Sequence, residues 1–172
     1  TPDTDITITE KLHGTSFIIS NIEVLRKLTF FEKIKKMLRI KFQDKEFDIV
    51  YSSRNVIKNK SINQKVSDGF YTTDVYGEIA RKFGPYIPKG MTIYGECVGF
   101  EEGTSKCIQK KGGKQYVYGC VGGRNKIMPY RILEKTDKGT VEWDVNKIVR
   151  WIRSLLIENP ELDGYLISPK VF

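Results

Sequence analysis

The order of strand-like and helix-like segments along the chain constrains its fold more than any other feature of the sequence. Polar–apolar alternation and enrichment in β-branched and aromatic residues predict strands. The predicted strands cover residues 5–9, 16–20, 45–55, 91–100, 114–122, 126–135 and 163–172. Apolar spacing close to the helical repeat predicts helices over residues 22–38, 74–83 and 144–158. Because strands and helices do not alternate regularly, we expect an α+β fold with largely antiparallel sheets.

The size and charge of the chain limit the kinds of protein it can be. Its 172 residues are enough for one substantial domain, and a 40% hydrophobic content can supply a packed core. The formal net charge is +8. A basic surplus of this size favours a polyanionic partner such as nucleic acid or a nucleotide, although an inert basic surface would give the same count.

Cysteine and histidine usage argues against a structural zinc site. The three cysteines, Cys97, Cys107 and Cys120, form no Cys-x-x-Cys pair, and His13 is the only histidine. We therefore expect reduced thiols and a cytoplasmic protein. The sequence has neither a signal peptide nor a long apolar run, so no membrane association is expected.

Lys11 is the candidate nucleophile. It follows a predicted strand and begins a Lys-x-x-Gly pattern that ends at Gly14, where a ligand could approach the backbone. A lysine becomes nucleophilic when desolvation or nearby cations lower its pKa, and attack on a nucleotide α-phosphate would give a phosphoramidate. By spacing alone, an ordinary surface lysine is the better explanation.

Four short stretches together resemble one enzyme family. The stretch "EKLHGTSF" resembles motif I of the covalent nucleotidyltransferases, which are the ATP-dependent DNA and RNA ligases and the mRNA capping enzymes. The Lys-x-His-Gly-Thr form followed by Phe17 is most similar to RNA ligases of the phage and RNA-editing type. "YSSRN", "YGECVG" and "DGYLI" resemble the later motifs in the family's order, and "KIMPYRI" is similar to the strand that offers an aromatic ring to the base. The family often has Asn at the position of Ser16 and Glu at that of Asp163.

The resemblance implies a nucleotidyltransferase (ligase adenylation) fold over residues 1–172, with Lys11 forming a covalent lysyl-AMP from ATP. It implies a nucleotide site made of Glu10, His13, Gly14, Arg54, Glu96, Tyr130, Asp163 and Lys170. In this family the acidic residue before the lysine serves the adenine, which points to Glu10. Tyr130 would stack on the base, and Arg54 would contact the phosphates. Glu96 and Asp163 would hold Mg²⁺ or Mn²⁺.

Four of these residues also have an ordinary structural explanation. Arg54 could be a solvated residue at a strand end, and Glu96 a strand residue that faces water. Asp163 could be a turn residue before Gly164, and Tyr130 a plain core residue. The glycine-rich, basic segment 104–123 could be a solvated hairpin tip or a loop that contacts a nucleic-acid backbone.

The function expected from the resemblance is ATP-dependent RNA ligation by a cytoplasmic monomer. A cell infected by a phage or virus is one setting for it. Its RNA partner would carry 5′-phosphate and 3′-hydroxyl ends. The family's last motif, Lys-x-Lys, has no counterpart within the nine residues that follow Asp163, where Lys170 is the one lysine. We therefore expect either a domain truncated after the fourth motif or Lys170 in place of one of those lysines. DNA ligation, guanylyl transfer to RNA ends and an inactive nucleic-acid-binding relative remain alternatives.

Overall fold

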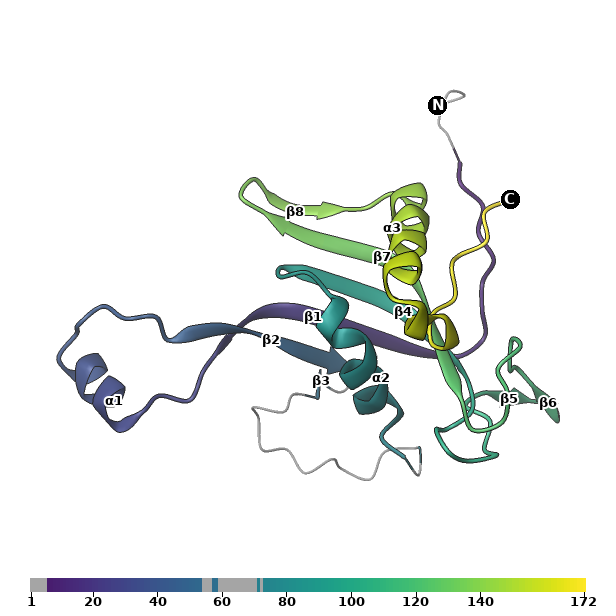
Figure 1. The fold of residues 1–172 in the computed structure, drawn as a ribbon, viewed down its shortest axis with the longest axis horizontal. Coiled ribbons are helices and arrows are strands. Elements are labelled where there is room, and N and C mark those ends of the chain that lie inside the picture. The colour runs from purple at the N-terminus through teal and green to yellow at the C-terminus, as the bar shows by residue number, and fades with distance from the viewer. Residues whose placement is uncertain (1–5, 54–56, 59–70, 72) are drawn as a thin grey trace.

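A six-stranded antiparallel sheet organises the described part of the chain. The computed structural model describes residues 6–53, 57–58, 71 and 73–172. Within these residues the strand order is β3-β2-β1-β4-β7-β8 (Figure 1). The strands are β1 (Thr15–Leu25), β2 (Lys45–Ser52), β3 (Ile57–Lys58), β4 (Met91–Gly99), β7 (Asn125–Thr136) and β8 (Gly139–Glu142), and a separate ribbon pairs β5 (Lys110–Lys111) with β6 (Lys114–Gln115). The α+β class expected from the sequence agrees with this mixed structure.

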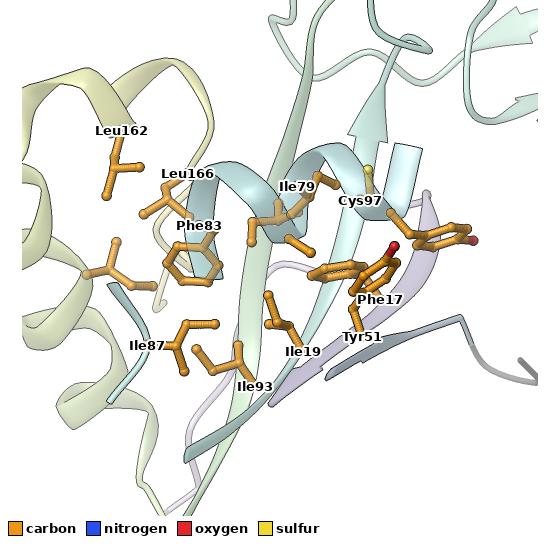
Figure 2. Packing of buried hydrophobic residues seen from close by; sticks show 14 of the residues in the cluster. Phe17, Ile19, Tyr51, Ile79, Phe83, Ile87, Ile93, Cys97, Leu162 and Leu166 are labelled. Carbon is orange, nitrogen blue, oxygen red and sulfur yellow. The ribbon is translucent and has the colours of Figure 1, made fainter. Parts of the chain in front are cut away.

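Two helices, α2 (Val75–Phe83) and α3 (Val145–Glu158), cover one face of the sheet (Figure 1). Phe17 and Ile19 of β1 and Ile93 of β4 point into the core beneath these helices, where Phe83 of α2 meets them (Figure 2). Because side chains alternate between the faces of a strand, the neighbours of these core residues lie on the opposite face. That face carries a smaller apolar cluster of Leu12, Val98, Cys120 and Met128.

The boundaries of both covering helices agree with the sequence. The side chain of Asp74 accepts a hydrogen bond from the Gly77 N–H and caps α2. The side chain of Asp144 accepts one from the Lys147 N–H and caps α3. These short polar side chains satisfy backbone donors that a first helical turn leaves unpaired, which is why they mark the helix starts in the sequence.

The first predicted helix, over residues 22–38, is wrong in its first part. Strand β1 continues to Leu25, because each residue up to that point pairs with β2, ending with Leu25 opposite Lys45. The helix that forms is α1 (Phe30–Met37), which starts at a capping box between Thr29 and Glu32. The cross-strand ladder thus outweighs the helical spacing of the first apolar residues.

Three predicted strands are also wrong in extent, and three observed strands, β3, β5 and β8, were not predicted. Residues 6–8 form no strand, and Thr9 makes only a single bridge to Val171. In segment 114–122 only Lys114–Gln115 is a strand, since the chain then turns through positive φ angles at Tyr118 and Gly119. Strand β8 was not expected; it follows a turn in which Gly139 has a φ of 120°.

The last predicted strand, over residues 163–172, is replaced by a 3-10 helix and single bridges. The 3-10 helix η2 (Pro160–Gly164) includes Asp163. After it, Leu166 makes a parallel bridge to Ile127, and Val171 pairs with Thr9. Pro169 lies between these two bridges and has no N–H to donate to a ladder, which accounts for the interruption.

Candidate active site

A pocket of about 380 Å³ brings together residues from three distant parts of the chain. Its lining consists of Thr9, Glu10, Lys11, Leu12, Glu96, Met128 and Tyr130. Four of these residues, Glu10, Lys11, Glu96 and Tyr130, were singled out in the sequence. Met128 belongs to the apolar cluster on the sheet face opposite the two covering helices, so the pocket opens on that face.

Lys11 is held in the pocket by the residue that follows it. Leu12 is only 3% exposed and packs with Val98 and Met128 on the uncovered face of the sheet. Lys11 itself is exposed and lines the pocket. The apolar anchor therefore fixes the backbone while the amine remains accessible to a ligand in the pocket.

Gly14 brings the end of this segment against β4. Its N–H donates a hydrogen bond to Oε1 of Glu96 at 3.0 Å. A Cβ atom at Gly14 would lie 2.1 Å from the backbone oxygen of Cys97, so no other residue fits without movement. The sequence suggested that this glycine lets a ligand approach; what approaches it in the structure is the neighbouring strand.

The register between β1 and β4 positions Glu96. Ser16 lies opposite Glu96, and Thr15 lies opposite Cys97, so the end of the Lys11 segment is aligned with the middle of "YGECVG". The Glu96 side chain is half-buried, lines the pocket and uses Oε1 to accept from Gly14. Its second carboxylate oxygen, Oε2, takes no part in that contact.

Tyr130 is displayed by a β-bulge. Tyr94 pairs with Arg131 and the next residue, Gly95, pairs with Pro129, so Tyr130 is the extra residue of β7. A bulge re-aims the side chain of the inserted residue. Tyr130 is 45% exposed and lines the pocket, which excludes the plain core role considered for it.

His13 lies beside the pocket rather than in its lining. Its backbone N–H donates to the Tyr118 hydroxyl at 2.7 Å, and its ring centroid is 5.0 Å from that of Tyr116. These two tyrosines were not identified as site residues in the sequence. Their aromatic character within a glycine-rich segment was the available signal.

Asp163 is also outside the pocket lining. It is exposed on η2, and its backbone oxygen accepts from Lys126 Nζ at 3.5 Å. The preceding residue, Leu162, is 2% exposed in the core under α2 and α3. Among the residues that the structure describes, no three His, Cys, Asp or Glu side chains are grouped as metal ligands.

Lys170 contacts the site through Glu10. Its Nζ lies 3.6 Å from Glu10 Oε2, and its backbone oxygen accepts from the Glu10 N–H at 3.2 Å. This ion pair is largely exposed, so it adds little stability by itself. Lys170 lines a different groove, beside α3, together with Arg150 and Arg153. Arg54 lies outside the described residues.

The cysteine nearest to the site has no nucleophilic role. Cys97 adjoins Glu96 on β4 but is fully buried on the helix-covered face. Burial raises the pKa of its thiol well above the ordinary value, which keeps it protonated. On the same covered face, burial also raises the pKa of Tyr76, whose hydroxyl lies 2.8 Å from Thr15 Oγ1 and ties α2 to the start of β1.

The comparisons with known proteins identify no relative. A scan against protein-family models matches no family, and searches of curated proteins and of solved structures find no match. In the described residues, no helix is both long enough and apolar enough to cross a membrane.

Proposed function

We propose that this chain is the nucleotidyltransferase domain of an ATP-dependent RNA ligase, with Lys11 as its nucleophile. The observation that carries the proposal is the common pocket of Lys11, Glu96 and Tyr130. Each of the three residues belongs to a different motif-like stretch of the sequence, and all three line the same pocket.

In the first step, the Lys11 Nζ attacks the α-phosphorus of ATP. A nitrogen–phosphorus bond forms, the bond to the β-phosphate oxygen breaks, pyrophosphate leaves, and the amine releases a proton to solvent. Tyr130 stacks on the base through its exposed ring. Glu10, next to the lysine, contacts the base edge, and Glu96 Oε2 faces the ribose or the metal-bound phosphates. Such chemistry depends mainly on positioning and charge neutralisation.

The pocket suits a divalent cation that is bound with the nucleotide. Mg²⁺ is commonly held by one or two carboxylates together with substrate phosphates and waters, and Mn²⁺ accepts the same oxygen ligands. Glu96 offers one such carboxylate in the pocket, whereas Asp163 does not line it. The bound metal would neutralise phosphate charge at the leaving pyrophosphate.

The remaining steps join two RNA ends. AMP passes from Lys11 to the 5′-phosphate of an RNA, which regenerates the lysine and creates a 5′–5′ pyrophosphate link. The 3′-hydroxyl of a second end then attacks the RNA phosphate, forms the phosphodiester, loses its proton and releases AMP.

The test is covalent labelling with nucleotide. The chain is incubated with α-labelled ATP or GTP and Mg²⁺ or Mn²⁺, and a denaturing gel is run. We expect an acid-labile label from ATP that disappears in Lys11→Ala and persists in Lys110→Ala, which removes an exposed lysine outside the pocket. Label from GTP alone would indicate a capping-type enzyme, and no label with either nucleotide would overturn the catalytic proposal.

A second candidate is a nucleic-acid-binding relative without nucleotidyl transfer. The observation in its favour is that Lys11 is the one cation among the described lining residues of the pocket, while Lys170 lies outside it. The triphosphate would then lack the additional positive charge that transfer requires. The same labelling assay separates the two candidates.

A further inference from the structure

An arm of residues 26–44, referred to below as the α1 arm, carries most of the positive charge surplus. It connects β1 to β2, holds α1 and projects beyond the end of the sheet (Figure 1). Its 19 residues include seven lysines and arginines but only two carboxylates, whereas the whole chain has 29 and 21. The arm thus has a net charge of +5 out of the total of +8.

The α1 arm is an ordered element. The Arg26 guanidinium makes a bidentate contact with the Glu32 carboxylate and donates to the Gln43 backbone oxygen at 2.9 Å, which closes the base of the arm. Glu32 also accepts from the Thr29 N–H in the capping box. The second acid, Asp44, lies 3.6 Å from Lys36. Both acids of the arm are therefore paired with cations of the arm, Arg26 and Lys36. The other cations of the arm are Lys27, Lys33, Lys35, Arg39 and Lys41.

The arm also presents aromatic rings to solvent. No residue of α1 is buried. Phe30 and Phe31 are 73% and 75% exposed, with their ring centroids 6.0 Å apart in an edge-to-face arrangement. Met37 and Leu38 continue the apolar side of the helix. Exposed apolar groups beside a cluster of cations indicate a surface used for binding.

We propose that the α1 arm binds single-stranded RNA, with its cations on the phosphates and Phe30 and Phe31 stacked on bases. A single strand offers negative charge and aromatic faces together, and both kinds of group are present on the arm. A second copy of the chain would bring like charges together. The choice of a polynucleotide rests on the proposed function, in which the protein must hold RNA. The described pocket lining has two carboxylates and one cation, so it offers little positive charge for an RNA backbone.

The α1 arm lies far from the pocket that contains Lys11. Lys11 precedes β1, and the α1 arm follows its other end (Figure 1). Strand β1 has 11 residues, which at about 3.3 Å each separate the two regions by roughly 35 Å. A single strand has to extend over roughly 35 Å to reach both regions. Only longer RNAs can therefore use the arm and the pocket at once.

The charge part is tested with Lys33→Gln/Lys35→Gln/Lys41→Gln in the absence of ATP. The matched control is Lys89→Gln/Lys135→Gln/Lys138→Gln, which removes three exposed lysines elsewhere. Anisotropy with a labelled single strand of about 30 nucleotides should show roughly tenfold weaker binding for the arm variant alone, with its log–log salt slope reduced by about 2. Equal losses in both variants would overturn a specific role of the arm.

The stacking part is tested by comparing two double variants of the same helix. Phe30→Leu/Phe31→Leu removes the rings but keeps apolar side chains, and we expect roughly fivefold weaker RNA binding. Met37→Ala/Leu38→Ala should change RNA binding less than twofold, because aliphatic groups do not stack. Unchanged RNA binding in both variants, with both losing affinity for vesicles of about 30% phosphatidylserine in phosphatidylcholine, would show instead that this face binds lipid.

The arm and the nucleotide site fail independently. Lys11→Ala should bind RNA as the unaltered chain does, and the three-lysine arm variant should keep the covalent label from ATP. In ligation assays the arm variant should lose activity on RNA of about 30 nucleotides but not on RNA too short to reach from the pocket to the arm. If the unaltered chain takes no label but binds RNA more tightly than the arm variant does, the ligase proposal falls and the arm proposal stands. Intact label with unchanged RNA binding in the arm variant would do the reverse.

Discussion

The backbone N–H of Gly14 donates a hydrogen bond to Oε1 of Glu96, and this contact joins the segment that carries Lys11 to the central strand β4. Because a Cβ atom at Gly14 would come within 2.1 Å of the Cys97 backbone oxygen, the contact depends on glycine. The pocket wall is therefore built by a close approach between two backbone segments, and its geometry is sensitive to both residues.

Gly14→Ala should destabilise the chain and disturb the pocket. The added methyl group must displace backbone of β4, and overpacking of this kind typically costs about 1–3 kcal/mol. Chemical denaturation measures the change in the free energy of unfolding. Gly122→Ala is the matched control, since its Cβ would meet nothing within 4 Å and its φ is not in the left-handed range. Equal stability of the two variants would contradict the close approach.

Glu96→Gln separates the structural role of this residue from its charge. The amide can still accept from the Gly14 N–H, so we expect a melting temperature close to that of the unaltered chain. In the proposed mechanism this carboxylate faces the nucleotide, so the rate of lysyl-AMP formation should fall roughly tenfold or more when it is lost. Glu96→Ala should lower both stability and rate. A normal labelling rate in Glu96→Gln would show that its charge has no part in the reaction.

Tyr130→Leu should weaken nucleotide binding without unfolding the protein. The ring is 45% exposed on a bulge, so little core packing is lost, whereas the stacking surface disappears. We expect the KM for ATP to rise roughly fivefold or more, as the loss of about 1 kcal/mol implies. Tyr130→Phe keeps the ring and should stay near normal. If both variants behave alike, the ring does not stack on the base.

The titration of Glu32 reports the base of the α1 arm. Hydrogen bonds from Arg26 and then from Thr29 lower the pKa of this carboxyl from 4.5 to about 2. Since the pKa is lowered in the folded chain, its stabilising effect is present above the ordinary value and is lost as pH falls towards 2. Carboxyl NMR should give a midpoint near 2 that moves towards 4.5 in Arg26→Met but not in Lys27→Met. A midpoint near 4.5 in the unaltered chain would rule out the closed base.

Part of the fold follows directly from local sequence. The helices over residues 74–83 and 144–158 were predicted with nearly their observed bounds, because the spacing of their apolar residues and the capping side chains at their starts are local features. The strands at 91–100 and 126–135 were predicted closely, since alternation marks a strand with one covered face. The helical spacing of residues 22–25 was misleading, because the pairing of β1 with β2 is a contact between distant segments that no local pattern contains.

The candidate site divides in the same way. The sequence by itself determined the chemical types at the site: one lysine before a glycine, a glutamate within a strand and a tyrosine on another strand. Tertiary structure alone decided which of them meet. The β1–β4 register brings Gly14 to Glu96, and the bulge in β7 places Tyr130 at the pocket, while η2 leaves Asp163 outside the pocket lining. Register and bulges arise from pairing between strands far apart in the chain, so the residues of one strand cannot specify them alone.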